Sequence, residues 1–223
     1  MCGIAGIHSL KHESIPDLGP KLDVMNQILR HRGPDGDANW SNPSETMGLI
    51  HRRLAIIDLT PSGAQPMTDG LGNWIVFNGE IYNYIEVRQE LGPDQFTTNS
   101  DTEVILASFR KWGTDCVNHL RGMFAFVIWN ETDRSLFCAR DRFGIKPFYY
   151  LIRDGTFYFA SEVKALLPFV DQIETDLDGF KDYLTFQFCL AGKTLFKGVR
   201  ELLPAHVLTI REGELHTHKY WEV

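Results

Sequence analysis

The sequence predicts an α+β fold, in which antiparallel sheets carry helices on their outer sides. Short apolar runs joined by turn residues recur along the chain, and the pair joined by Asp154-Gly155 is the clearest β-hairpin signal. Helical periodicity is confined to a few isolated segments. Runs of hairpins interrupted by isolated helices are typical of α+β proteins rather than of alternating α/β proteins.

Apolar runs bounded by turn signals are expected to form the strands. In chain order these runs cover residues 2–8, 47–51 continuing into 54–58, 74–78, 123–129, 136–139, 148–152, 156–160, 207–210 and 215–220. Asn130-Glu131-Thr132-Asp133 and Glu212-Gly213 mark two further hairpin turns. The stretch 60–66 is rich in Pro, Ser and Gly and is expected to be a loop.

Helices are expected at 18–30, 83–91, 102–112, 162–167 and 177–186. The first of them places its leucines and Met25 on one face, which is the pattern of a helix packed on a core. Ser100 and Glu103 form a capping-box pattern at the start of the third helix.

The composition excludes several classes of protein. The chain has 223 residues, of which 43% are hydrophobic and 23% charged, as in an ordinary globular protein, and we assign residues 1–223 to one domain. A net charge of -7 argues against a nucleic-acid partner, which needs a basic surface. No apolar run reaches the ~20 residues of a membrane helix, and no signal-peptide pattern opens the chain. A membrane partner is therefore not expected.

The cysteines and histidines give no metal-site pattern. Four widely scattered cysteines match neither a zinc site nor a disulfide framework, which favours a reducing, cytoplasmic setting. Cys138 and Cys189 lie in apolar runs and are expected in the core. His216 and His218 alternate on an expected strand; a polar strand face is favoured over a metal site.

Cys2 becomes the first residue when the initiator Met1 is removed, as we expect it to be. The free α-amine and the thiol then titrate near neutrality, at about 7.7–8 and about 8.5 in unperturbed form. The amine can take the proton of the thiol and deliver it to a leaving group, so one residue supplies both nucleophile and base. Cys2 alone is a weak signal, because a cysteine at this position can occur by chance.

The motifs that follow Cys2 strengthen the catalytic interpretation. In order along the chain they are Cys2-Gly3-Ile4-Ala5-Gly6, Arg30-His31-Arg32-Gly33-Pro34-Asp35, His51-Arg52-Arg53-Leu54-Ala55-Ile56-Ile57-Asp58, Asn78-Gly79-Glu80-Ile81-Tyr82-Asn83 and Ser100-Asp101-Thr102-Glu103. Together they resemble the glutamine amidotransferase domain of the N-terminal-nucleophile type. The later segments 122–126, 140–147 and 160–166 resemble the glutamine-hydrolysing asparagine synthetases in particular.

This resemblance implies a four-layer αββα sandwich, an N-terminal-nucleophile hydrolase fold, with the nucleophile at the end of a central strand. The implied reaction converts L-glutamine and water into L-glutamate and ammonia through a γ-glutamyl thioester on Cys2. Asn78 and Gly79 match the oxyanion hole of the family, through the Asn78 amide and the Gly79 backbone N–H. The alternative interpretation of Asn78-Gly79 is a type I′ turn.

The same resemblance assigns the two ends of the substrate. Arg53 matches the arginine that binds the glutamine α-carboxylate in two parallel hydrogen bonds, and on a strand its neighbour Arg52 would point to the opposite face. Asp101 matches the residue that pairs with the α-ammonium, although a helix dipole alone favours aspartate there. The remaining pocket residues are expected to be Leu54, Ala55, Ile56, Ile57 and Glu80. The segment 32–36 either closes over the substrate or braces the pocket.

The partner implied by the resemblance is a C-terminal synthetase domain of the same full-length chain, and a homodimer is possible. ATP and Mg²⁺ are expected only for that synthetase domain, since no Ser-Gly-Gly-x-Asp-Ser stretch occurs here, and no cofactor is expected for the glutaminase. Two alternatives stay open: a glutaminase domain or stand-alone protein that feeds a different acceptor, and a non-catalytic glutamine-binding module. The segment 140–142 is expected to face the partner domain.

Overall fold

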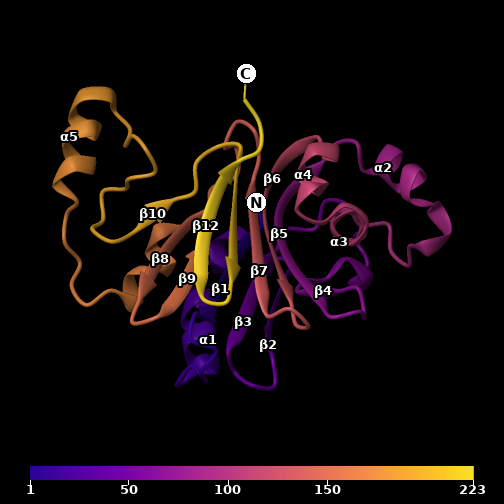
Figure 1. Cartoon of the computed structure of the whole chain (residues 1–223), viewed down its shortest axis with the longest axis horizontal. Helices are drawn as coiled ribbons and strands as arrows, with labels where there is room; N and C mark the ends of the chain where they lie inside the picture. Colours follow the sequence, from indigo (N-terminus) through magenta and orange to yellow (C-terminus); the bar gives the residue numbers. More distant parts are fainter. Residues whose placement is uncertain (223) are drawn as a thin grey trace.

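Two six-stranded sheets form the centre of the computed structural model, which describes residues 1–222 (Figure 1). Sheet A has the strand order β10-β8-β9-β1-β3-β2, and sheet B has the order β12-β11-β7-β6-β5-β4. All neighbouring strands run antiparallel. The strands are β1 (Gly3–Ser9), β2 (Gly36–Ser41), β3 (Met47–Arg53), β4 (Met67–Thr68), β5 (Asn73–Ile81), β6 (Gly122–Asn130), β7 (Ser135–Arg140), β8 (Tyr149–Arg153), β9 (Thr156–Ala160), β10 (Arg200–Glu201), β11 (His206–Arg211) and β12 (Glu214–Lys219).

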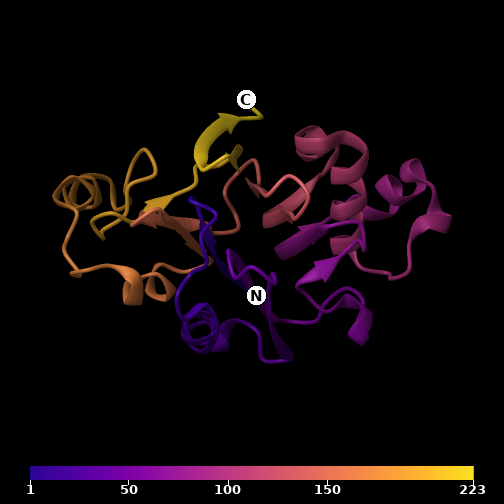
Figure 2. The same cartoon turned by 60° about the horizontal axis from the view of Figure 1, so that its bottom comes forward.

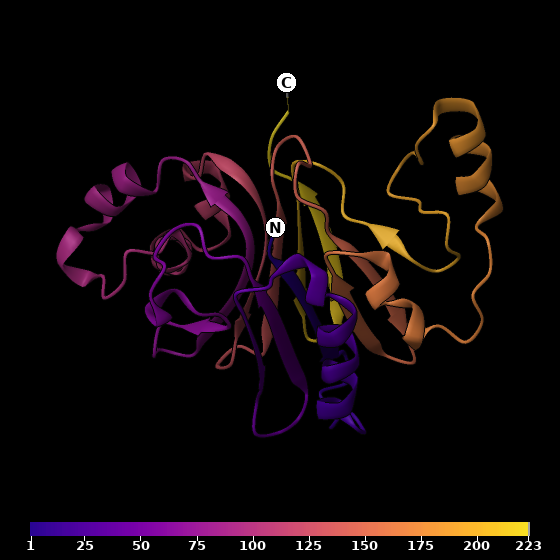
Figure 3. The same ribbon diagram turned by 180° about the vertical axis from the view of Figure 1, so that it is seen from behind.

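Helices cover the outer sides of both sheets, except for the last helix, which lies apart from them. They are α1 (Leu18–Ile28), α2 (Tyr84–Leu91), α3 (Asp101–Trp112), α4 (Cys116–His119) and α5 (Leu177–Phe186). Seen from behind, α1 lies on the outer face of sheet A (Figure 3). Helices α3 and α4 pack on sheet B, so the order of layers is helix, sheet, sheet, helix. The expected αββα sandwich is confirmed.

Three hydrophobic cores separate these four layers. The central core joins side chains of both sheets, such as Ile4 and Phe159 from sheet A with Val127 from sheet B. Along β6 the side chains alternate between this core and the core under α3. Since β6 is buried on both faces, its sequence is almost continuously apolar instead of alternating with polar residues.

Two expected elements are wrong. Residues 54–58 form a loop, because the Leu54 N–H donates to the Cys2 sulfur and Arg53 binds carbonyl groups further along the chain. The expected helix at 162–167 is instead two short 3-10 turns, Val163–Ala165 and Leu167–Phe169. Pro168 lacks an N–H and disfavours the α conformation of the residue before it, so an α-helix cannot continue through this point. The edge strands β2, β4 and β10 were not expected from the sequence.

Helix α5 stands apart from the layers, at one end of the long axis of the molecule (Figure 2). Gly179 is its single buried residue, and Leu177 and Leu184 are 69% and 67% exposed. We call its exposed apolar side chains the α5 surface: Leu177, Phe180, Tyr183, Leu184, Phe186 and Phe188. Isolated helices of this length are marginal in water, and a cluster of exposed apolar side chains marks an interaction site.

The cysteine expectations are half right. Cys138 is fully buried in the central core. Cys189 follows the α5 surface and is only half-buried, because its apolar run lies outside all three cores. Its thiol donates to the Gly179 carbonyl. Within residues 1–222, no helix has both the length and the apolar character needed to cross a membrane.

We predict that Gly6→Ala lowers the free energy of unfolding by about 1–3 kcal/mol, the usual effect of overpacking. A Cβ at Gly6 would lie 2.5 Å from the Phe159 ring and 2.6 Å from the Gly48 carbonyl oxygen. Urea unfolding measures the change, and Gly19→Ala is the matched control because nothing lies within 4 Å of its Cβ position. Equal stabilities of the two variants would contradict the packing described for β1.

Candidate active site

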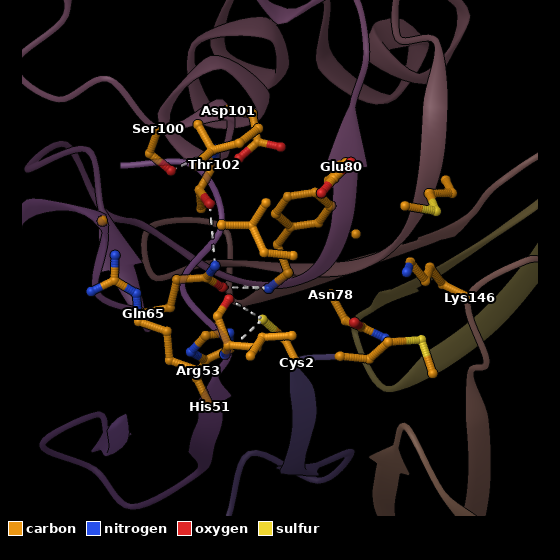
Figure 4. A pocket seen from close by; sticks show the side chains of 18 residues that line it. Cys2, His51, Arg53, Gln65, Asn78, Glu80, Ser100, Asp101, Thr102 and Lys146 are labelled. Carbon is orange, nitrogen blue, oxygen red and sulfur yellow. Dashed lines mark hydrogen bonds between the residues drawn. The ribbon is translucent and has the colours of Figure 1, made fainter. Parts of the chain in front are cut away.

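A cavity of about 60 Å³ opens at the start of β1, where the ends of β3 and β5 meet the first turn of α3 (Figure 4). Its wall is formed by Met1, Cys2, His51, Arg53, Leu54, Ile56, Ile57, Gly63, Gln65, Phe77, Asn78, Gly79, Glu80, Ser100, Asp101, Thr102, Met123 and Lys146. This set contains every site residue expected from the sequence except Ala55. Their individual roles stay predictions.

Cys2 is held from two sides. Its sulfur accepts a hydrogen bond from the Leu54 N–H at 3.3 Å and donates to the Leu54 carbonyl at 3.5 Å. Arg32 donates through Nε to the Cys2 carbonyl at 2.9 Å, and Glu162 pairs with the same guanidinium at 2.8 Å. Burial raises the pKa of the Cys2 thiol, whereas the Leu54 N–H and nearby positive charges lower it.

Asn78 and Gly79 lie inside β5, so the turn interpretation is wrong. The Asn78 side chain is 1% exposed, and its amide Nδ2 has no hydrogen-bond partner among residues 1–222. A buried donor without a partner costs about 1–3 kcal/mol. Gly79 is also required by packing, because a Cβ there would lie 2.1 Å from the Met123 carbonyl oxygen of the neighbouring strand.

Arg52 and Arg53 point to opposite faces of β3, as predicted. Arg52 donates to the Asn26 carbonyl and pairs with Asp37 at 3.4 Å, away from the cavity. Arg53 lies in the cavity wall and donates to the carbonyls of Asp58 and Thr60. A guanidinium has five N–H donors, so Arg53 keeps donors for a further acceptor.

Asp101 is the first residue of α3 and is 4% exposed. Its carboxylate accepts a hydrogen bond from the Ile81 N–H at 3.0 Å, which joins the helix to the end of β5. Burial raises the pKa of Asp101 to about 6. The expected capping box is half right. The Ser100 hydroxyl accepts a hydrogen bond from the Thr102 N–H, but the Glu103 carboxylate accepts from the Thr97 and Thr98 N–H groups instead of from the Ser100 N–H.

The loop 54–57 and the segment 32–36 support each other. The Ala55 N–H donates to Asp35 Oδ2 at 2.9 Å, and Ala55 is not part of the cavity wall. Gly33 packs directly on the backbone of Arg52, where a Cβ would lie 2.3 Å from the carbonyl carbon. The segment 32–36 therefore braces the site.

Several wall residues were missed by the sequence analysis. Gln65 is buried and bridges two elements, since it donates to the Thr102 hydroxyl and accepts from the Phe77 N–H. Burial lowers the pKa of His51 to about 3, so the ring stays neutral near pH 7. Lys146 reaches the wall from the loop between β7 and β8. Their local sequences carry no signal, because only the folded chain brings these segments to the cavity.

The segment 140–142 is not a surface charge cluster. Arg140 and Asp141 are 5% and 0% exposed and bind backbone groups of the loop that follows β7. Arg142 donates to the Leu120 carbonyl. Among residues 1–222, no group of three or more His, Cys, Asp or Glu is arranged to hold a metal ion, and His216 and His218 are exposed on β12.

The wall combines the groups needed for acyl transfer. A cysteine sulfur and an unpaired amide donor line one part of it, and a nucleophile beside fixed donors suits a reaction that develops negative charge on a carbonyl oxygen. Arg53 and Asp101 add a guanidinium and a carboxylate to the same wall. The charges of this wall therefore complement those of an amino acid.

Comparisons with known proteins agree with this geometry. The family described as "Glutamine amidotransferase domain" matches residues 1–221. The chain is 42% identical over 228 residues to asparagine synthetase [glutamine-hydrolyzing] 1 of Bacillus subtilis, and 36% identical over 234 residues to amidase chry2 of Gibberella zeae. All of this chain is covered in both matches, but only 35% and 34% of the relatives, so the chain spans about a third of their length.

A solved structure shows the same fold at low sequence identity. It is the glutamine phosphoribosylpyrophosphate amidotransferase of B. subtilis, with a TM-score of 0.71 and 18% identity over 99% of this chain and 49% of that one. The fold, the composition of the cavity wall and the match over almost the whole sequence agree. The chain belongs to the glutamine amidotransferase domain family.

Proposed function

We propose that this chain hydrolyses L-glutamine to L-glutamate and ammonia, with Cys2 as the nucleophile. The proposal depends on one observation about the Asn78 amide. This buried donor has no partner within residues 1–222, and it lies in the same cavity wall as Cys2. Such a donor is unfavourable until an acceptor arrives, and the carbonyl oxygen of a glutamine side chain supplies one. An intact nucleophile and donor argue against a purely binding module.

The reaction proceeds in two acyl-transfer steps. The Cys2 thiolate attacks the side-chain carbonyl carbon, a C–S bond forms, and the carbonyl electron pair moves to oxygen, facing the Asn78 amide and the Gly79 N–H. The α-ammonium of Cys2 gives a proton to the amide nitrogen, the C–N bond breaks, and ammonia leaves the γ-glutamyl thioester. Water then adds to the thioester carbonyl and gives a proton to the α-amine of Cys2. The carbonyl re-forms, the C–S bond breaks, and glutamate leaves the Cys2 thiolate beside the regenerated α-ammonium.

The charged ends of the substrate select glutamine from other amides. Arg53 binds the α-carboxylate with the donors that the loop carbonyls leave free, and Asp101 pairs with the α-ammonium. Both ends are then fixed, so the amide carbon is placed against the sulfur. This hydrolysis needs no cofactor in the proposed scheme.

Met1 must be absent in the active form. With Met1 attached, the Cys2 nitrogen is an amide and cannot act as a base. Met1 also forms part of the cavity wall, and about 60 Å³ is room for a few water molecules rather than for glutamine. Removal of Met1 therefore frees the base and enlarges the site.

We further propose that the ammonia is passed to an ATP-dependent asparagine synthetase domain. Relatives named as glutamine-hydrolysing asparagine synthetases are about three times as long as this chain, and the α5 surface leaves apolar side chains for a neighbouring domain to cover. ATP and Mg²⁺ belong to that domain in this scheme, and the setting is cytoplasmic.

A homodimer is the alternative occupant of the α5 surface. Relatives named as amidases keep a different ammonia acceptor open.

Ammonia release from three forms of the protein tests the glutaminase proposal. The form without Met1 is expected to be active, and a form that retains Met1, verified by mass, is expected to work barely above background. Cys2→Ala without Met1 should lose several orders of magnitude in kcat. Equal activity of the forms with and without Met1 would show that the base is a group other than the α-amine. An active Cys2→Ala variant would show that Cys2 is not the nucleophile.

The roles of Asn78 and Arg53 separate in the kinetics. Asn78→Ala removes a transition-state donor and should lower kcat by ~10²–10³. Arg53→Lys keeps the charge but loses the bidentate geometry, so KM for glutamine should rise more than kcat falls. The same kinetic signature for both variants would contradict this division of roles.

Glutamine binding should weaken in acid because of Asp101. With its pKa raised to about 6, the carboxylate is ionised above that pH and protonated below it, while the glutamine ammonium stays charged. Calorimetry on Cys2→Ala should show a Kd that is constant from pH 7 to 8 and rises about tenfold per unit well below pH 6. Asp101→Asn is the control and should bind weakly at every pH. A Kd that is flat down to pH 5 would exclude an ion pair with Asp101.

A further inference from the structure

One cation in the cavity wall has no part in the reaction described above. Lys146 is 6% exposed, and within residues 1–222 it forms hydrogen bonds only through its backbone. Figure 4 shows its amine end directed toward the side of the cavity that carries Glu80 and Asn78. The side chain is packed into the wall while its ammonium has no hydrogen-bond partner among the described residues, so the charge acts on the groups that face the cavity.

The loop that carries Lys146 is fixed by two buried side chains. The Asp141 carboxylate accepts hydrogen bonds from four backbone N–H groups, those of Phe124, Phe143, Ile145 and Lys146. Arg140 donates to the carbonyls of Gly144 and Lys146 at 2.9 and 2.8 Å. These contacts hold the backbone of Lys146 against the end of β7, so its amine reaches the cavity from a rigid base.

The charges around Lys146 are those of the catalytic wall. Glu80, Cys2 and Asp141 attract its ammonium and Arg32 repels it, and the Asp141 carboxylate also accepts the four N–H hydrogen bonds. Burial lowers the pKa of Lys146, and the field of Glu80 and Cys2 acts against this change. In turn, the positive N-terminus and, after it, Lys146 oppose the rise that burial imposes on the pKa of Cys2. Asp101, on α3, acts on Cys2 with the opposite sign.

We propose that Lys146 is a cation that, beside the α-ammonium of the chain, favours the thiolate form of Cys2 in this cavity, and that it continues to stabilise the negative charge when it passes from sulfur to the substrate oxygen. The inference rests on the proposed function, because it takes Cys2 as the nucleophile. A lysine suits the role because its ammonium is a compact point charge that needs no bidentate geometry.

Alkylation of Cys2 by iodoacetamide tests this role without glutamine, because the thiolate is the reacting form. The rate is followed against pH by peptide mass spectrometry in wild type, Lys146→Met, Lys146→Gln and Lys146→Arg, all without Met1. Both neutral variants should move the midpoint up by about one pH unit, with a rate about tenfold lower below it. Lys146→Arg should keep the wild-type midpoint. Cys189, which lies outside the cavity, is the internal control and should not change.

The outcomes separate the two proposals. A wild-type Cys2 profile in both neutral variants, with near-ultraviolet circular dichroism showing a native fold, would overturn the role of Lys146. A shift shared by Cys189 would also overturn it, because the effect would then be global. If the Cys2 shift occurs but wild type releases no ammonia from glutamine, the proposed function fails and the electrostatic role of Lys146 stands.

Discussion

The hydrogen bond from Arg32 to the Cys2 carbonyl fixes the N-terminal end of the chain, on which the proposed chemistry depends. Chain termini are poorly ordered unless they are tied down, and the proposed nucleophile lies next to the N-terminus. Arg32 is itself held by an ion pair with Glu162. Two residues after Cys2, the Ile4 N–H donates to the Ser161 hydroxyl, and the Ser161 N–H donates to the Ile4 carbonyl. The sulfur can therefore face Leu54 in a fixed position. The roles of β1, β3 and the brace 32–36 all follow from this requirement.

Around that fixed sulfur the cavity keeps polar groups that a purely structural core would have paired or excluded. Within residues 1–222 the Asn78 amide has no partner, the pKa of Asp101 is raised, and the Lys146 ammonium forms no hydrogen bond. Each of these groups makes the empty site less stable, and a bound amide with complementary charges would offset that cost. Donors and charges set in advance do not reorganise during the reaction, which is how such sites stabilise developing charge.

The sandwich explains how so many polar groups can stay in place. Three apolar cores hold the two sheets and their helices, and β6 contributes to two of them with alternate side chains. The cavity lies at the start of β1 and near the C-terminal ends of β3 and β5, where pairing with the neighbouring strands holds the wall residues in place. By contrast, α5 lies outside these cores, and its apolar side chains remain exposed.

The sequence by itself determined the fold class, most strands and helices, and the members of the site that lie in recognisable motifs, such as Cys2, Arg53, Asn78 and Asp101. Apolar runs, turn residues and motif order are local properties, so they can be read along the chain. Only the tertiary structure decided that residues 54–58 leave the sheet and hold the Cys2 sulfur, that the Asn78 amide finds no partner within residues 1–222, and that Ala55 lies outside the cavity wall. It alone brought Gln65, His51 and Lys146 to the cavity, because contacts between segments far apart in the chain, and the burial that shifts a pKa, exist only after the sheets have packed.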